Sequence, residues 1–471
     1  MIRKVSIIEV KSEHLHIFSQ FELPRIGATL LATILRDRGV DAEALFLSRA
    51  ALLKRRIETD LAGLSTITAT APASYAVADD LRQRGIPVVI GGPHASFQPE
   101  EALEHGDYCL VGEAEQTLPL LVEALDGRRA LEDVPGLVWR KDGAIVRNSA
   151  ARPIDDLDSL PFPDYSLLDM GRRRMGAFML GGSIVPVQTS RGCPYDCSFC
   201  SVTGMFGKRY RFRSTANVIA ELEQYKANQH IFFYDDNFAA NSRHTRELLL
   251  AMIGRNFGFH WSTQVRADVA RDAELLDLMV RAGCSTVFIG FESVDPKALA
   301  EMHKGQSVEQ MRRAVHELRG RGVHVHGMFV FGFDADSPDT VRATVDFAIR
   351  ERIDSAQFLL LTPLPGSELF RRLSAEGRLN DRDWDDYDAH HVTFRPTGFT
   401  AWKLQLAQIR AHARFYSWAH VVGRLLHGRL AGFIVGVYAH RLNHRWARKE
   451  RGYLRTLRRP AGVGGALPIE G

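Results

Sequence analysis

Three of the five cysteines in this 471-residue chain lie close together in the stretch RGCPYDCSFC, residues 191–200, as Cys193, Cys197 and Cys200. Thiolates are soft ligands that bind iron–sulfur clusters and zinc. Three thiolates on a four-iron cube leave one iron free to take a small ligand, whereas a structural zinc ion requires a fourth protein ligand. The nearest downstream histidine, His230, lies outside this stretch. An iron–sulfur cluster is therefore favoured, and zinc remains the alternative.

The other two cysteines, Cys109 and Cys284, stand alone in apolar segments. We expect them to be small buried side chains rather than ligands. A chain with so few cysteines, three of them clustered, is typical of a reducing compartment, so a cytoplasmic location is expected.

The cysteine stretch follows the first strand of a long series in which strand and helix patterns alternate. The expected strands are 184–189, 231–234, 259–265, 286–291, 323–331 and 356–361. The expected helices are 215–227, 241–254, 272–282, 308–320 and 338–351. This alternation predicts an α/β fold with a partial (β/α)6 barrel.

Polar residues and glycines gather where these expected strands end, and barrel enzymes place their active sites at that face. The candidate binding residues there are Asp235, Asp236, Asn237, Gln264, Arg266, Glu292, Gly327 and Pro365.

The N-terminal part also alternates strands and helices and predicts a Rossmann-like, doubly wound sheet. The expected strands are 4–10, 42–47, 63–70, 87–90 and 108–111, with helices over 26–38, 74–84 and 116–125. Ligands bind at the carboxyl ends of strands in such sheets. The candidates at these ends are Ser65, Thr66, Gly91, Gly92, His94, Gly112 and Glu113.

The cysteine motif, with aromatic Phe199 before its last cysteine, resembles that of the radical S-adenosylmethionine (SAM) superfamily. The resemblance implies that Cys193, Cys197 and Cys200 hold a [4Fe-4S] cluster whose open iron chelates SAM. In that family the reduced cluster cleaves SAM to a 5′-deoxyadenosyl radical, which abstracts hydrogen from carbon. By position, the resemblance assigns contact with the amino group of the methionine moiety of SAM to Asp235, Asp236 and Asn237. This Asp-Asp-Asn departs from Gly-Gly-Glu, which is commoner in the family at this place. It assigns ribose and carboxylate contacts to Arg266 and Glu292, and the adenine to 327–332 and Leu364-Pro365.

The N-terminal part resembles a cobalamin-binding domain at LPRIG (23–27), STITAT (65–70), IGGPH (90–94) and GEAE (112–115). Many such domains carry Asp-x-His-x-x-Gly after the first strand. Here KSEHLHIFSQ (11–20) holds His14 and His16 without that frame, so we expect cobalamin without a histidine lower ligand.

Together the two parts resemble the cobalamin-dependent radical SAM class, which includes anaerobic magnesium-protoporphyrin ester cyclase and several carbon and phosphorus methylases. The resemblance implies methyl transfer from methylcobalamin to an unactivated carbon of a small-molecule substrate, with electrons from a flavodoxin- or ferredoxin-type partner. A cyclisation or rearrangement is the alternative within the class. A non-enzymatic iron–sulfur electron carrier is the alternative outside it.

Four regions are expected: a cobalamin domain (1–135), a linker with a hairpin (136–183), the barrel (184–375) and a mostly helical C-terminal domain (376–471). In residues 421–460, ten Arg and Lys side chains accompany one acid, Glu450. We expect this tail to be the solvated end of a C-terminal helix. Contact with an anionic membrane surface is the alternative and would favour a lipid or tetrapyrrole-like substrate. The overall formal charge of +4 gives no reason to expect a nucleic-acid partner. His390 and His391, beside aromatic residues, are expected to pack in a loop rather than reach over the site as a lid.

Overall fold

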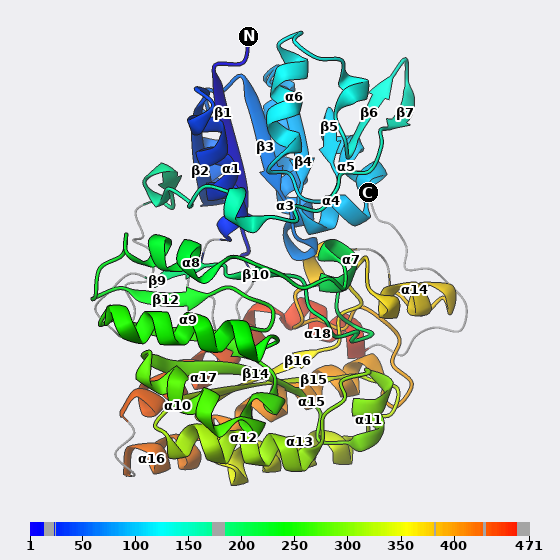
Figure 1. The fold of residues 1–471 in the computed structure, drawn as a ribbon. Coiled ribbons are helices and arrows are strands. Elements are labelled where there is room, and N and C mark those ends of the chain that lie inside the picture. The colour runs from blue at the N-terminus through cyan, green and yellow to red at the C-terminus, as the bar shows by residue number, and fades with distance from the viewer. Residues whose placement is uncertain (14–22, 24, 172–183, 381–382, 427–429, 459–471) are drawn as a thin grey trace.

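The computed structural model describes the whole chain except residues 14–22, 24, 172–183, 381–382, 427–429 and 459–471. Its described strands form two large sheets, drawn one above the other in Figure 1, and a small two-stranded hairpin. His14 and His16 lie outside the described residues.

The N-terminal sheet has eight strands in the order β7-β6-β5-β4-β3-β1-β2-β8. Strands β1 to β5 pair in parallel, as the alternating pattern predicts, and β5, β6 and β7 pair antiparallel. The strands are β1 Lys4–Lys11, β2 Asp41–Ser48, β3 Leu61–Ser65, β4 Val88–Gly91, β5 Tyr108–Leu110, β6 Leu137–Lys141, β7 Ala144–Arg147 and β8 Leu168–Asp169. The segment expected as a linker therefore supplies three strands of this sheet.

The helices that accompany this sheet are α1 Ile26–Asp37, α2 Arg49–Lys54, α3 Ala71–Gln83, α4 Pro93–Phe97, α5 Pro99–His105 and α6 Thr117–Leu125. One expected strand, 63–70, is shorter than predicted. It ends at Ser65, and residues 68–70 form a single 3-10 turn.

The second sheet has six parallel strands in the order β16-β15-β14-β13-β12-β9, so the open, partial barrel is confirmed. Its strands are β9 Ile184–Val187, β12 His230–Phe233, β13 His260–Val265, β14 Cys284–Glu292, β15 His324–Phe331 and β16 Ser355–Leu360. Its helices are α8 Thr215–Leu222, α9 Ser242–Arg255, α10 Ala273–Arg281, α11 Pro296–Glu301, α12 Val308–Gly320, α13 Pro338–Arg350 and α14 Glu368–Ala375.

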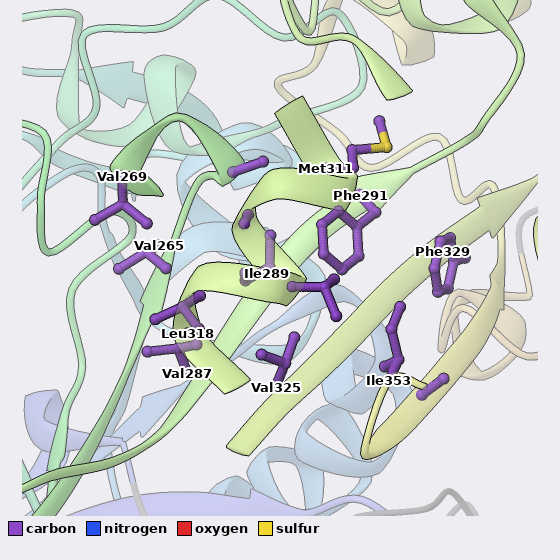
Figure 2. Packing of buried hydrophobic residues seen from close by; sticks show 14 of the residues in the cluster. Val265, Val269, Val287, Ile289, Phe291, Met311, Leu318, Val325, Phe329 and Ile353 are labelled. Carbon is purple, nitrogen blue, oxygen red and sulfur yellow. The ribbon is translucent and has the colours of Figure 1, made fainter. Parts of the chain in front are cut away.

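Packing between strands and helices holds this barrel together. Figure 2 shows Phe291 of β14 and Phe329 of β15 among the aliphatic side chains of the core, with Met311 of α12 near Phe291 and Leu318 of α12 beside Val287. All four side chains are buried, and burial of one such side chain contributes about 1.5–3 kcal/mol. Helix α12 starts at a fixed point because Ser307 and Gln310 form a reciprocal capping box.

The C-terminal helices are α15 Ala401–Phe415, α16 Trp418–Leu426, α17 Leu430–Lys449 and α18 Arg451–Arg458. Tyr416 joins them to the barrel, because its hydroxyl donates to the carbonyl of Ala356 in β16 and accepts from the same residue's amide. Within the described residues, every helix is too short or too polar to cross a lipid bilayer.

Candidate active site

The cysteine loop begins in the hairpin of β10 (Ser190–Arg191) and β11 (Arg211–Phe212) and ends at α7 (Val202–Phe206). It lies between the two large sheets (Figure 1). Cys193, Cys197 and Cys200 are all free thiols with partial exposure, so a group entering the loop can reach them.

Cys193, Cys197 and Cys200 are the residues that would hold an iron–sulfur cluster. In the part of the chain that the structure describes, no three His, Cys, Asp or Glu side chains converge closely enough to hold one metal ion. Burial raises the pKa of Cys193, and it raises the pKa of Cys200 to about 12. Cationic iron offsets such a penalty, because metal ligation requires the thiolate form.

Asp235 fixes the chain that leads into the cysteine loop. Its carboxylate is fully buried and accepts hydrogen bonds from the amides and hydroxyls of Thr189 and Ser190. Burial raises its pKa to about 6 although these hydrogen bonds oppose the shift. Both oxygens are thus engaged by the turn after β9, and the expected contact between Asp235 and SAM remains a prediction.

Asp236 has different surroundings. Its side chain keeps solvent contact and accepts no hydrogen bond from any described residue, although its charge acts on Cys193 and Cys200. Partial desolvation and the Asp235 carboxylate raise its pKa to about 7. Of the two expected aspartates, Asp236 is the one open to a ligand beside the cysteines.

Asn237 and Gln264 are brought together by their backbones. The amide of Phe238 donates to the carbonyl of Gln264 at 3.0 Å, and the hydroxyl of Tyr210 donates to the carbonyl of Asn237 at 3.1 Å. The ends of β12 and β13 are therefore joined, as expected for neighbouring parallel strands.

Arg266 connects the end of β13 to the cysteine loop. Its guanidinium lies 3.8 Å from the centre of the Tyr195 ring, and its Nη1 lies 4.0 Å from the Sγ of Cys197. Its Nη2 donates to the carbonyl of Lys304. The Tyr195 hydroxyl in turn donates to Asp268 at 3.0 Å. The structure therefore places a fixed positive charge beside the second cysteine.

Glu292 lies at the end of β14, where the strand register shifts after Gly290. It has a positive φ of 61°, and its carboxylate pairs with Lys304 Nζ at 2.7 Å. A Cβ at Gly290 would overlap the Glu292 carboxylate, so this position has no room for a side chain. Buried Lys304 was not among the predicted residues, because nothing in the sequence pattern indicates that it faces Glu292.

The two residues expected near the adenine differ in their surroundings. A Cβ at Gly327 would contact Phe329, Phe291 and Ile353, so its Cα faces the core shown in Figure 2. Pro365 lies in the loop after β16. In that loop Gly366 packs against the ring of Phe97, from the N-terminal part. Pro365 thus lies where the two parts of the molecule meet.

A glycine-rich cradle forms at the carboxyl ends of β3 and β4. The amide and hydroxyl of Thr66 both donate to the carbonyl of Gly91 at 2.9 Å. Gly92 has φ 92°, and a Cβ there would lie 2.7 Å from backbone atoms of Thr66 and 3.3 Å from the hydroxyl of Ser65. Only glycine fits this close approach.

His94 does not face the cradle. Its ring is fully buried, with Nδ1 3.3 Å from the Thr68 hydroxyl and Nε2 3.2 Å from Glu101. Trp384, from the C-terminal region, donates to the same Glu101 carboxylate at 2.8 Å. Both ring nitrogens therefore have partners within the protein, Thr68 and Glu101. Contact between His94 and cobalamin remains a prediction.

Gly112 and Glu113, at the end of β5, have different surroundings. Gly112 has φ 92°, and no atom lies within 4 Å of the position that a Cβ would take there. The Glu113 carboxylate instead accepts two hydrogen bonds from Arg211, at 2.6 and 2.9 Å, and lies 3.4 Å from Arg191. Glu115 pairs with Arg191 at 2.6 Å. Glu113 therefore holds the cysteine hairpin.

Sequence reasoning missed Arg191, Arg211 and Glu115 as partners because the paired residues lie 76 and 98 residues apart along the chain. Cys109 and Cys284 are buried free thiols, as predicted. His390 and His391 are buried as well: His391 Nδ1 lies 3.0 Å from Asp388, and the side chain of Gln405 in α15 donates to the carbonyl of His390.

Two family matches fall within the two sheets, one in each part of the chain. Residues 187–348 match the family described as Radical SAM superfamily, and residues 17–122 match the B12 binding domain. An uncharacterized methyltransferase from Pyrococcus horikoshii is 32% identical over 409 residues, which is 83% of this chain and 88% of that protein. Bacteriochlorophyllide d C-12(1)-methyltransferase of Chlorobaculum tepidum is 28% identical over 78% of this chain and 76% of its own.

Solved structures share the fold. The radical S-adenosylmethionine methyltransferase TsrM from Kitasatospora setae, a structure with cobalamin and a [4Fe-4S] cluster bound, superposes with a TM-score of 0.66 at 23% identity. The superposition covers 80% of this chain and 78% of that one. The cobalamin-dependent radical enzyme OxsB gives 0.67 at 16% identity and covers 96% of this chain and 75% of its own. With a three-cysteine loop at the end of one parallel sheet and a glycine cradle at the end of another, the chain belongs to the radical SAM superfamily, in the group that carries a B12-binding domain.

Proposed function

We propose that this protein is a methyltransferase that adds a methyl group to an unactivated carbon of a small molecule. The observation that carries this proposal is the arrangement of two sites in one molecule, with the cysteine loop held directly against the end of the glycine cradle by Arg191 and Arg211. When bound, a reduced [4Fe-4S] cluster supplies the electron that cleaves SAM, and cobalamin supplies the methyl group.

Each group of residues has one task in this proposal. Cys193, Cys197 and Cys200 hold the cluster, and Arg266 lies beside it with its positive charge. Asp236 offers a free carboxylate for the amino group of SAM. Lys304 and Glu292 offer a buried pair of opposite charges at the barrel mouth for the polar groups of the same ligand.

Cobalamin occupies the cradle formed by Ser65, Thr66, Gly91, Gly92 and Gly112. Gly112 leaves its backbone open to a ligand, because no atom lies within 4 Å of the position of a Cβ there, whereas Gly92 packs against the backbone of Thr66.

A tetrapyrrole-like or lipid substrate is the class that we favour. The Chlorobaculum relative is named for methylation of a bacteriochlorophyllide, and a hopanoid C-2 methylase of Rhodopseudomonas palustris is 29% identical over 62% of this chain and 53% of its own. Trp418 and Val422 of α16 and Ile434 of α17 are exposed apolar side chains in the basic C-terminal region. At a membrane surface these apolar side chains would enter the lipid boundary and the basic residues would face anionic headgroups, where such a substrate would be present.

A flavodoxin- or ferredoxin-type protein is the reductant that we propose, and the free thiols suit the cytoplasm. Radical cyclisation is the second candidate. It is favoured by the 27% identity, over 76% of this chain and 66% of the relative, to anaerobic magnesium-protoporphyrin IX monomethyl ester cyclase of Rubrivivax gelatinosus.

The proposal is tested by reconstituting the protein anaerobically with iron and sulfide and reducing it with dithionite in the presence of SAM. We expect release of 5′-deoxyadenosine, and Cys197→Ala should lower it to background. Cys284→Ala is the matched control, because this buried thiol lies in β14 and should leave the release unchanged. Release that persists in Cys197→Ala would contradict the assignment of the ligands.

A further inference from the structure

Four buried charges join the cobalamin-binding part to the cysteine loop. Glu113 and Glu115 follow β5, and Arg191 and Arg211 face each other across the β10–β11 hairpin. The side chains of these four residues, the interdomain ion-pair cluster, are 2–9% exposed. Such burial keeps solvent from screening the charges, so the pairs resist displacement.

The geometry of the cluster is specific. Arg211 binds Glu113 with both terminal nitrogens and also donates to the carbonyl of Ile154 at 2.6 Å. Arg191 binds Glu115 at 2.6 Å, and its Nε donates to Gln188 at 2.9 Å. Bidentate arginine–carboxylate pairs fix orientation as well as distance. Burial alone would raise the pKa of Glu113, but Arg211 and Arg191 lower it below its ordinary value, so the carboxylate is charged.

The cluster lies close to each site along the backbone. Gly112, whose Cα faces open space in the cradle, directly precedes Glu113. Arg191 is separated from Cys193 only by Gly192, which has φ 86° and leaves no room for a Cβ beside the carbonyl of Arg209. The preceding residues 189 and 190 are fixed by Asp235. The cluster therefore connects the backbone at Gly112 to the start of the cysteine loop.

We infer that the interdomain ion-pair cluster couples the two sites energetically, so that cobalamin bound at the cradle changes the affinity of the cysteine loop for SAM. This inference rests on the proposed function. Glu113, Glu115, Arg191 and Arg211 act in it as positioning residues. By linkage, SAM must change the affinity for cobalamin by the same factor.

The test measures the dissociation constant of SAM on the full, anaerobically reconstituted chain, with and without saturating hydroxocobalamin. The cobalamin constant is then measured with and without SAM. For each ligand, the ratio of its dissociation constant without the other ligand to that with it measures the coupling. We expect the SAM ratio and the cobalamin ratio to agree and to differ from one by about fivefold or more. Glu115→Gln keeps the shape of the side chain but removes the negative charge that pairs with Arg191. Both ratios should therefore approach one. Iron content and circular dichroism establish that this variant is folded and loaded.

The matched control is Glu132→Gln, which breaks the exposed pair between Glu132 and Lys141, also 2.6 Å long. It should leave both ratios at the wild-type value. Wild-type protein that binds both ligands with ratios of one would overturn the inference and leave the proposed function intact. Protein that binds neither cobalamin nor SAM would overturn both. If Glu115→Gln does not fold, Glu113→Gln, which removes the charge that pairs with Arg211, takes its place with the same expected result.

Discussion

Asp235 and Asp236 are neighbours in sequence, and the structure gives them opposite surroundings. The first accepts four hydrogen bonds from residues 189 and 190, and the second accepts none from described residues. Identical side chains therefore serve two purposes: one holds the entry to the cysteine loop, and the other is free for a ligand.

We expect Asp235→Asn to lower the free energy of unfolding by about 2–3 kcal/mol. The backbone amides of Thr189 and Ser190 would lose a charged acceptor, and the amide nitrogen of asparagine, itself a donor, would face them. Iron content after reconstitution should fall with it. Asp236→Asn is the control and should change stability by less than about 0.5 kcal/mol, as surface substitutions do, while it weakens SAM binding. Denaturant unfolding and iron assays measure these effects. Equal stability losses in the two variants would contradict this division of roles between the aspartates.

At this scale the sequence predicts some residues well and others poorly. The spacing of Cys193, Cys197 and Cys200 is local, so the ligand set is readable from a ten-residue stretch. Partners of buried charges are not readable, because pairing depends on how distant strands meet. Glu113 is thus predicted as a cradle residue from its sequence position, and only the fold shows Arg211 beside it.

Among the elements, the turns after β4 and β5 each carry a glycine with φ 92°, Gly92 and Gly112. A Cβ at Gly92 would meet the backbone of Thr66 at 2.7 Å, and one at Gly112 would meet nothing within 4 Å. The first glycine is thus required by the fold, and the second leaves space for a ligand.

Gly92→Ala should lower the free energy of unfolding by about 3 kcal/mol or more, since steric overlap adds to the strain of a positive φ. Gly112→Ala should lower the free energy of unfolding by only about 1–2 kcal/mol, because alanine is strained at a positive φ. The same substitution should weaken cobalamin binding at least about tenfold. Thermal unfolding and hydroxocobalamin titration measure the two effects. Unchanged cobalamin affinity in a folded Gly112→Ala would place the cobalamin elsewhere.

The loop between α14 and α15 provides a pH-dependent contact. Burial alone would lower the pKa of His391, but Asp388, Asp386 and Glu450 raise it above its ordinary value. A raised pKa in the folded state means that the stabilisation is fully present below the unfolded value, about 6.5, and is lost as pH rises through the folded value.

His391→Gln should therefore be less stable than the wild type at pH 6, and the difference should shrink at pH 9. Melting temperatures of both proteins across this range test the sign. A difference that grows with pH would mean that the histidine is neutral in the folded protein.

For the whole molecule, the order of elements was predictable because strand and helix periodicities alternate through both halves. The parallel strands β1 to β5, the six barrel strands and the five expected barrel helices are found within five residues of their expected ends. The way the halves meet was not predictable. The meeting of Phe97 with Gly366, and of Trp384 with Glu101, depends on tertiary packing between residues far apart in the chain.

A single chain that binds SAM at a three-cysteine cluster and cobalamin at the facing cradle should pass a methyl group from one cofactor to the other. The most direct test supplies SAM with a labelled methyl group to reconstituted protein loaded with cobalamin and reduced anaerobically. We predict labelled methylcobalamin together with 5′-deoxyadenosine from the same sample, and loss of 5′-deoxyadenosine in Cys197→Ala. Protein that contains zinc in place of iron, or that binds cobalamin but never acquires its label, would contradict this prediction.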